Sequence, residues 1–487
     1  MKYQNIIDNM TLKEKAAFLS GKSEWQTRDF PRLDIPAIFC SDGPNGVRKQ
    51  AGAGDHLGIN PAVPATCFPT AAAMANSWDE ELEQRVGVAL GEESMEEDVN
   101  VLLGPGLNIK RNPLCGRNFE YFSEDPYLSG KMAAAFIRGV QSTGAAACAK
   151  HFAVNSQELR RMAMNAVVDE RTLREIYLTG FEIAIKEGGA KTVMSSYNEV
   201  NGVYANENEH LLKDILRDEW GFEGSVITDW GASNDHSLGV KNGSTLEMPT
   251  PGLDAARELL ASVESGKISE KDIDERVDEL LDLVLTTTEN AKHYKKVADK
   301  KALHEEHHKL ARLACENSAV LLKNEDGILP VGAKVQAAVI GDFAFDPRYQ
   351  GAGSSMVNST KVDSIKDMLK TSGISVTGIV RGYQRDGKED ETMKKEAVDL
   401  ARRSDVVLFF FGLNEKSETE GLDRKHLRIP QNQINLIQEL AKANANMIGI
   451  ISAGSVIEML WHHHFKALLH TALMGQAGAG AVLDILS

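Results

Sequence analysis

Residues 221 to 233 read GFEGSVITDWGAS, in which a short apolar run ends abruptly at an acidic residue and a tryptophan. The residues from Ser225 to Thr228 suit a buried strand, and Asp229 follows them directly. A carboxylate at the end of a buried strand destabilises the fold unless it is paired, hydrogen-bonded or hydrated. Asp229 is therefore either an ordinary residue of the turn that ends the strand or a placed catalytic group.

A second group of acids lies in FGLNEKSETEGLDR, residues 411 to 424, where an apolar run opens into a loop that contains a glycine. Its members are Glu415, Glu418, Glu420 and Asp423. These acids either form a solvated surface loop, or one of them is brought to face Asp229. Two carboxyl groups on either side of a glycosidic bond, one ionised and the other protonated, are the usual equipment for glycoside hydrolysis.

Groups that could bind a polyol occur at or just after the ends of several expected strands. They are Asp42, Arg48, Arg117, Lys150, His151, Arg161 and Tyr197. Sugar hydroxyls are well matched by charged, bidentate partners, and Trp230 offers an apolar surface for a pyranose ring. For any one arginine the alternative is a surface ion pair, and for His151 it is a structural histidine.

Short apolar strands alternate with helical patterns between about residues 35 and 290. We expect strands over 36–43, 99–106, 145–152, 191–198, 224–231 and 244–249, and helices over stretches such as 170–188 and 208–221. This alternation predicts a parallel sheet, and its length favours a TIM-type (β/α)8 barrel, complete or degenerate. Many of these strands end in a polar residue, Glu247 among them, and in a barrel such ends converge on one face.

The stretch from 288 to 302 is polar and indicates a linker, which is followed by a helical pattern over 303–324. Further strands are expected over 335–342, 374–380, 406–413, 447–454 and 465–473. With the helical patterns between them, they predict a doubly wound α/β sheet.

We therefore predict three parts: a TIM-barrel-like catalytic domain over 1–290, a linker and leading helix over 291–317, and an α/β sandwich domain over 318–487. The sequence stops at GAGAVLDILS without a closing strand. We accordingly expect the sandwich domain to be incomplete at its carboxyl end.

The composition restricts the class of partner. The 487 residues include 54 Lys and Arg against 70 Asp and Glu, a net charge of −16. This sign argues against nucleic acid and anionic lipid, and it fits a neutral substrate. No apolar run approaches the roughly 20 residues that a membrane-spanning helix needs. A homo-oligomer is left open.

The cysteines and histidines give no sign of a metal centre. The five cysteines form no C-x-x-C pair, which is typical of reduced thiols, and the amino-terminal stretch lacks the apolar region of a signal peptide, so we expect a cytoplasmic protein. The runs HEEHHK (304–309) and WHHHFK (461–466) have no further type of ligand nearby, and we expect no metal and no cofactor.

The sequence resembles glycoside hydrolase family 3, of the β-glucosidase type, from about residue 5 to its end. The resemblance rests on long motifs in a fixed order. They are SDGPNGVR (41–48), ATCFPTAAAMANSWDEEL (65–82), GPGLNIKRNPLCGRNFEYFSEDPYLSG (104–130), AKHFAVNSQELRR (149–161), VMSSYNEVNG (193–202), GSVITDWGA (224–232), YQGAGSS (349–355) and ETEGLDR (418–424).

The resemblance implies a retaining exo-β-glucosidase that acts through a covalent glycosyl-enzyme on a β-glycoside substrate. Asp229 matches the position of the nucleophile and Glu420 that of the general acid/base, with Glu418 as a rival. We expect Asp229 to be the more buried of the pair, with Tyr197 as a nearby hydrogen-bond donor. The matched sugar-binding positions are Asp42, Arg48, Arg117, Lys150, His151, Arg161, Met194, Tyr197, Trp230 and Ser354.

Two alternatives stay open. A β-xylosidase or another exo-β-glycosidase could use the same scaffold, because the pocket for the C6 group cannot be read from the sequence. The chain could also be a truncated, non-catalytic sugar-binding relic.

Overall fold

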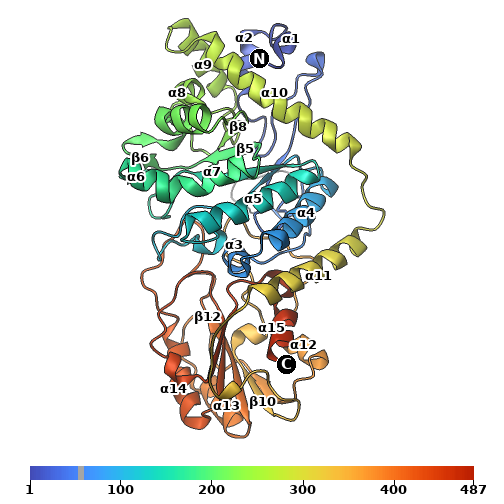
Figure 1. Cartoon of the computed structure of the whole chain (residues 1–487), viewed down its shortest axis with the longest axis vertical. Helices are drawn as coiled ribbons and strands as arrows, with labels where there is room; N and C mark the ends of the chain where they lie inside the picture. The colour runs from blue at the N-terminus through green and yellow to red at the C-terminus, as the bar shows by residue number, and fades with distance from the viewer. Residues whose placement is uncertain (53–59) are drawn as a thin grey trace. The chain divides into compact units, whose positions relative to one another are not determined.

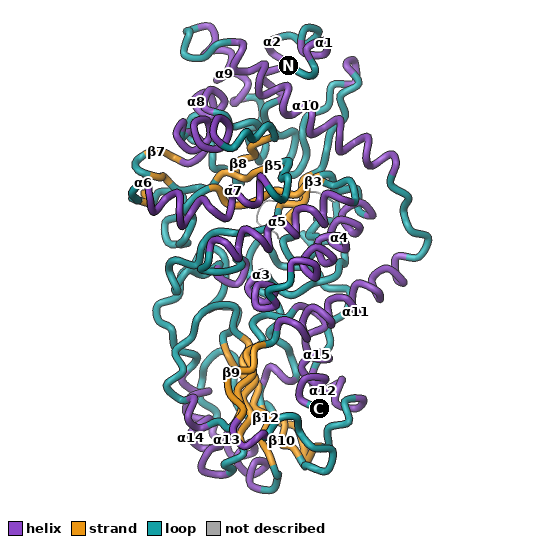
Figure 2. The backbone as a smooth tube through the Cα atoms, viewed as in Figure 1, coloured by secondary structure: helices purple, strands orange, loops and turns teal. Residues whose placement is uncertain are grey.

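The computed structural model describes residues 1–52 and 60–487, and the packing of their Cα atoms divides the chain into two compact units (Figures 1 and 2). The first, here called the barrel unit, comprises Met1–Ala65, Asp79–Arg111 and Tyr121–Lys300. The second, the sandwich unit, comprises Thr66–Trp78, Asn112–Glu120 and Lys301–Ser487. Two short segments from the first third of the sequence therefore pack with the sandwich unit.

The barrel unit is built on a parallel sheet of buried strands in the order β1-β2-β3-β5-β8. Their bounds are β1 Cys40–Asp42, β2 Val101–Leu103, β3 Ala146–Phe152, β5 Thr192–Ser195 and β8 Ser225–Thr228. Each lies within an expected strand. The stretch 244–249 forms only isolated parallel bridges, from Leu246 to Ile227 and from Glu247 to Ser20. The predicted α/β barrel is thus confirmed in its degenerate form.

Helices surround this sheet, and in Figure 1 α5 lies between α4 and α7. Their starts follow local rules: Asp125 caps α5 ahead of Pro126, and Ser269 and Asp272 form a capping box on α10. The helices of this unit are α1 Gln4–Ile7, α2 Leu12–Phe18, α4 Glu80–Glu96, α5 Pro126–Ser142, α6 Glu170–Thr172, α7 Thr179–Lys186, α8 His236–Asn242, α9 Asp254–Glu264 and α10 Glu270–His293.

The helical patterns expected over 170–188 and 208–221 contain π-helical segments, Leu173–Leu178 and His210–Glu219. A small separate sheet consists of β4 Asn165–Ala166, β6 Glu199–Val200 and β7 Val203–Tyr204. Across the described residues, no helix has both the length and the apolar character required to cross a membrane.

The sandwich unit has a mixed sheet in the order β11-β10-β12-β13-β14-β9, parallel except for β9. The strands are β9 Val320–Asn324, β10 Ala337–Ile340, β11 Val376–Val380, β12 Val406–Gly412, β13 Met447–Ser452 and β14 Ala467–His470. The helices are α3 Ala71–Met74, α11 Lys300–Ser318, α12 Ile365–Met368, α13 Glu391–Arg402, α14 Gln431–Ala443 and α15 Gly478–Leu486. The predicted doubly wound sheet is confirmed.

Alternation along β12 explains why helices cover both faces of this sheet. Successive side chains of a strand point to opposite faces. Leu408 and Phe410 belong to a core shared with α12 and α15, whereas Phe409 and Phe411 belong to a core shared with α13 and α14. A strand that is buried on both faces needs an apolar residue at every position, which VVLFFFG supplies.

One expected helix is wrong at its end. The pattern over 303–324 predicts one continuous helix, but α11 ends at Ser318 and Val320–Asn324 form the edge strand β9. The run VLLKN pairs antiparallel with β14, and this tertiary pairing overrides the helical pattern. The polar stretch from 288 is also partly helical, because α10 continues to His293.

The segment 66–78 is joined to the rest of the sandwich unit through Gln476. The N–H of Cys67 donates to the side-chain oxygen of Gln476 (3.1 Å), and the N–H of Gln476 donates back to the carbonyl of Cys67 (2.8 Å). The Gln476 amide also contacts Nδ1 of His308 (3.0 Å), whose Nε2 faces Asp363 (3.0 Å). Buried polar groups are therefore satisfied by one another along this line.

We expect Phe411→Ala to lower the free energy of unfolding by about 3–5 kcal/mol, because it leaves a cavity in a packed aromatic cluster. Phe411 stacks at 4.8 Å on Phe409 and 5.5 Å from Phe465, and it meets Trp461 edge-on at 5.0 Å. Denaturant unfolding followed by tryptophan fluorescence measures the loss. Leu321→Ala, at a half-exposed edge position, is the control and should change stability little. Equal effects of the two substitutions would contradict this account.

Candidate active site

Asp229 is fixed where the buried strand β8 ends. Its N–H donates to the carbonyl of Ser195 at the end of the neighbouring strand β5 (3.1 Å). One carboxylate oxygen accepts the N–H of Trp230 (2.7 Å), and the other lies 3.7 Å from Nε2 of His151. The side chain is 12% exposed. The carboxylate is therefore held from two directions, and its side chain keeps a small exposed area.

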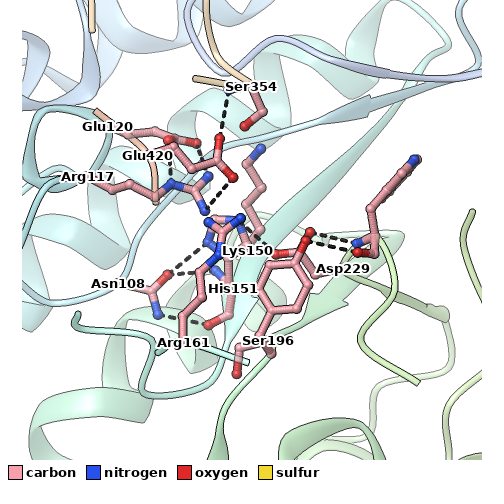
Figure 3. Close-up of polar contacts among 12 residues, drawn as sticks. Asn108, Arg117, Glu120, Lys150, His151, Arg161, Ser196, Asp229, Ser354 and Glu420 are labelled. Atoms are coloured by element: carbon pink, nitrogen blue, oxygen red, sulfur yellow. Dashed lines mark hydrogen bonds and ion pairs between the residues drawn. The ribbon is translucent and has the colours of Figure 1, made fainter. Parts of the chain in front are cut away.

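His151 is oriented by Asn108, a residue that the sequence analysis did not single out. The side-chain NH₂ of Asn108 donates to the backbone carbonyl of His151 (2.8 Å), and the side-chain oxygen of Asn108 accepts the backbone N–H of His151 (2.7 Å), as Figure 3 shows. The hydroxyl of Tyr121 lies 3.2 Å from Nδ1 of the ring. These contacts fix the imidazole so that its other nitrogen faces Asp229.

An ion pair joins Asp42, the last residue of β1, to Lys150, which lies near the end of β3. The Lys150 ammonium lies 3.5 Å from the Asp42 carboxylate, and their side chains are 2% and 11% exposed. The N–H of Arg48 donates to the backbone carbonyl of Asp42 (2.9 Å), which places the turn after β1. A buried ion pair of this kind offers both donors and acceptors to a polyol.

Arg161, Tyr197 and Trp230 form a connected series beside Asp229. The Arg161 guanidinium lies 4.6 Å over the ring of Tyr197 and pairs with Glu158 (2.8 Å). The Tyr197 hydroxyl donates to the carbonyl of Trp230 (3.0 Å). The Trp230 indole in turn packs on Trp25, with centroids 5.0 Å apart.

Met194 differs from the other predicted sugar-binding positions in this unit. It lies on β5, is 1% exposed and belongs to the apolar core of the barrel unit. Its observed contacts are those of a packing residue.

Within the sandwich unit, the structure brings Glu420, Arg117 and Ser354 together (Figure 3). One Glu420 carboxylate oxygen accepts the N–H of Ser354 (2.7 Å), and the other lies 3.7 Å from Nη1 of Arg117. Arg117 is also held by Glu120 through two hydrogen bonds of 2.9 and 3.0 Å. The Glu420 side chain is 16% exposed, slightly more than that of Asp229.

Two glycines allow the chain to approach the Glu420 loop closely. Gly353 has φ +122°, and a Cβ there would lie 2.4 Å from the Cβ of Glu420. A Cβ on Gly116 would lie 1.8 Å from the carbonyl oxygen of Leu422. A side chain at either position would push the loop away from its neighbours.

The four acids of this loop lie in different surroundings, although Glu415 and Glu418 both lie within 4 Å of Arg348. Glu418 is fully buried, lies 3.4 Å from Arg348 and accepts the hydroxyl of Ser455 (2.8 Å). Glu415 pairs with Arg385 (3.1 Å), and Asp423 accepts the N–H of Gly116 (3.1 Å). Burial raises the pKa of the Glu418 carboxyl. Glu418 and Glu420 are thus two residues apart but lie in different surroundings.

Glu247, in the stretch 244–249 that forms only isolated bridges, lies in a buried acidic cluster. Its carboxylate is 3.0 Å from Nδ1 of His236, and both side chains are largely buried. Burial, together with repulsion from Glu258 and Glu207, raises the pKa of Glu247 to about 7. Burial lowers the pKa of His236 to about 4. At neutral pH this histidine is therefore uncharged.

Comparison with protein families decides what this arrangement belongs to. The model of the glycosyl hydrolase family 3 N-terminal domain matches residues 23–283, and that of the family 3 C-terminal domain matches residues 319–487. The chain belongs to glycosyl hydrolase family 3.

The relatives of this family 3 chain include proteins with two activities in their names. It is 47% identical to thermostable beta-glucosidase B of Acetivibrio thermocellus over 99% of this chain and 64% of the relative. It is 42% identical to an exo-alpha-(1->6)-L-arabinopyranosidase of Bifidobacterium breve, with the same coverage. The chain thus spans slightly less than two thirds of the length of these relatives.

A solved structure has the same fold. The crystal structure of the GH3 beta-glucosidase of Bifidobacterium adolescentis matches with a TM-score of 0.92 and 42% identity, covering 99% of this chain and 68% of that one.

The sequence of this family 3 chain contains the supporting residues but does not reveal their contacts. Asn108, Glu120 and Glu158 all lie inside the motifs that carry the resemblance. Each orients a predicted site residue: His151, Arg117 or Arg161. Their position in a motif was the available signal, but their partners depend on loop geometry.

We expect the variants Glu247→Gln and His236→Gln to change the pH dependence of stability in opposite directions. The raised pKa of Glu247 gives stability below its ordinary value of 4.5 that is lost as the pH rises through about 7. The lowered pKa of His236 gives stability above its ordinary value of 6.5 that is lost as the pH falls through about 4. Each contribution is on the order of 3 kcal/mol, and the two act in opposite directions.

Relative to the native protein, Glu247→Gln should therefore lose stability as the pH falls from 7 to 4.5, and His236→Gln as the pH rises over the same range. Denaturant unfolding at several pH values measures both slopes. Parallel profiles for both variants and the native protein would contradict the assignment.

Proposed function

We propose that this family 3 protein hydrolyses terminal, non-reducing β-D-glucosyl residues with retention of configuration, through a covalent glycosyl-enzyme. The observation that carries the proposal is the Asp229 carboxylate, fixed by the N–H of Trp230 and by His151 at the end of a buried strand. A nucleophile needs a fixed position close to the carbon that it attacks.

Glu420 is proposed as the general acid/base. Its carboxyl lies on a loop, with partial exposure, between the Ser354 N–H and Arg117. The rival Glu418 is supported less well, because its side chain is 0% exposed and is already bound to Arg348 and Ser455. A group that exchanges protons with a leaving group and with water needs access to both.

The proposed reaction has two displacements. Asp229 attacks the anomeric carbon while Glu420 protonates the leaving oxygen, so that the glycosidic bond breaks and a glycosyl ester forms. Glu420, now a carboxylate, then takes a proton from a water molecule that attacks the same carbon and releases Asp229. Retaining enzymes of this type hold the two carboxyls about 5–5.5 Å apart.

The remaining predicted residues are proposed to hold the non-reducing sugar. Asp42 and Lys150 supply an acceptor and a donor for adjacent hydroxyls, and His151 donates near Asp229. Trp230 supplies an apolar face. Further hydroxyl contacts are assigned to Arg48, Arg117, Arg161, Tyr197 and Ser354, whereas Met194 is assigned to packing beneath the site.

A second candidate substrate follows from the arabinopyranosidase among the relatives. An α-L-arabinopyranoside has the same absolute arrangement at its anomeric carbon as a β-D-glycoside, so the same two acids could act on it. It lacks the C6 group, as does a β-D-xyloside. The choice among these substrates therefore depends on the pocket around C6 and on the contacts of the C4 hydroxyl.

We also propose a cytoplasmic location. All five cysteines are buried and free of disulfides, which is typical of a reducing compartment. A homo-oligomer stays a prediction from the sequence.

We expect an aryl β-D-glucoside to be hydrolysed with a kcat/KM at least about tenfold above that of the matching β-D-xyloside or α-L-arabinopyranoside, because a filled C6 pocket contributes binding energy. Initial rates on all three substrates with the same leaving group test this. A reversed preference would replace the glucoside by the preferred sugar. No turnover of any of them would support the non-catalytic alternative.

Asp229→Ala should lower kcat by about 10⁴-fold or more, because no carboxylate remains to form the ester. Added azide should restore turnover and give the α-glucosyl azide, since the small anion attacks from the vacated face in one displacement. Product configuration is read by NMR. Asp254→Ala, an acid with a 79% exposed side chain on α9, is the control and should leave kcat unchanged. Full activity of Asp229→Ala would end the proposed mechanism.

A further inference from the structure

Glu418 is a charged residue sealed inside the sandwich unit next to the proposed acid/base. Its side chain and that of Arg348 are 0% and 1% exposed and lie 3.4 Å apart. The Ser455 hydroxyl donates to its other oxygen (2.8 Å) and accepts from Arg424 (3.0 Å). Burial raises the pKa of Glu418 and lowers the pKa of Arg348 and of Arg424.

Burying an ion pair in a core contributes little to the free energy of folding. The mutual attraction of two buried charges offsets their lost hydration only with good geometry, and apolar replacements are often equally stable. Within the described residues, Nε and Nη1 of Arg348 have no hydrogen-bond partner, and Nε faces only the Glu415 carboxylate at 3.9 Å, so the hydrogen-bonding capacity of this arginine is not fully used. Stability alone therefore gives a weak reason for placing an ion pair here, whereas a requirement for a fixed position gives a stronger one.

The position of Glu418 is transmitted to Glu420 through one short backbone pairing. The N–H of Ala352 donates to the carbonyl of Glu418 (3.2 Å), and the N–H of Glu420 donates to the carbonyl of Ala352 (2.9 Å). Ser354, whose N–H binds the Glu420 carboxylate, lies two residues further along the same segment. Arg348 lies four residues before Ala352 on this segment. The ion pair thus joins the two strands of chain that together place the Glu420 carboxyl.

We propose that Glu418 is a positioning residue: its ion pair with Arg348 and its hydrogen bond from Ser455 fix residues 418–420 and so aim the Glu420 carboxyl at the leaving-group oxygen. This inference rests on the proposed function of Glu420 as acid/base. Glu418 itself does not touch the substrate. Its effect on the reaction is therefore confined to the steps in which Glu420 transfers a proton.

Glu418→Gln tests this role in the full chain, because it keeps the shape of the side chain and removes its charge. We expect kcat/KM on an alkyl β-glucoside to fall by about 10- to 100-fold, and on 2,4-dinitrophenyl β-glucoside by less than about threefold, because the dinitrophenolate leaves without a proton. Loss of stability alone would lower both rates together.

Azide separates positioning from proton transfer by Glu418 itself. In Glu420→Ala the anion should fill the vacated space, raise turnover of the dinitrophenyl glucoside and give the β-glucosyl azide. In Glu418→Gln azide should have no effect, because the Glu420 carboxylate still occupies its place. Azide rescue of Glu418→Gln would make Glu418 the acid/base and overturn the positioning role.

The matched control is Glu279→Gln, which breaks another buried arginine–glutamate pair. Glu279 lies 2.8 Å from Arg217, and its carbonyl accepts the hydroxyl of Ser225 at the start of β8, the end opposite Asp229. It should lower the melting temperature without any dependence on the leaving group. If Glu418→Gln does not fold, Ser455→Ala removes one hydrogen bond from the same carboxylate and should show a weaker form of the same dependence.

Two outcomes overturn the inference in distinguishable ways. If Glu420→Ala shows the leaving-group dependence and Glu418→Gln and Ser455→Ala do not, the positioning role fails and the proposed function stands. If Glu420→Ala shows no such dependence, the acid/base assignment fails and the inference fails with it.

Discussion

Each of the two carboxylates of the proposed site lies against an N–H group and a basic side chain, one carboxylate in each unit of the chain. Asp229 lies between the N–H of Trp230 and His151, and Glu420 lies between the N–H of Ser354 and Arg117. An unpaired buried charge would cost several kcal/mol. The residues that flank these acids therefore stabilise the fold, and under the proposed function the same groups also contact sugar hydroxyls.

The fixed positions of these groups have a consequence for the proposed reaction. Asp42 and Lys150 already face each other, and Glu120 already holds Arg117 through two hydrogen bonds. Dipoles and charges that are fixed in advance stabilise a transition state without having to reorganise as the charge develops. In this protein such groups are already held in place in the folded chain, by backbone turns and by neighbours such as Asn108.

The sequence predicts what depends on local pattern and fails where a distant contact decides. Strand ends are marked by a change from apolar to polar residues, so Asp42, Asp229 and the parallel sheets could be placed from the sequence alone. The edge strand β9 could not be predicted, because the helical pattern continues over the whole of 303–324. The helix ends at Ser318 because Val320–Asn324 pair with β14, which is distant in the sequence. Glu418 and Glu420 could not be separated either, since both are acids in one polar loop and their difference comes from Arg348, far away in sequence.

The division of the chain into two units also depends on contacts between residues that are distant in the sequence. The loop with Glu420 is completed by residues 112–120, which lie among the strands of the barrel unit in sequence but pack with the sandwich unit. Gly116 leaves room for the turn at Leu422, and Arg117 supplies a cation for Glu420. Gln476 holds a second such segment at Cys67. Residues 318–487 alone therefore lack the groups that place the proposed acid/base, and a boundary drawn along the sequence would separate Glu420 from Gly116 and Arg117.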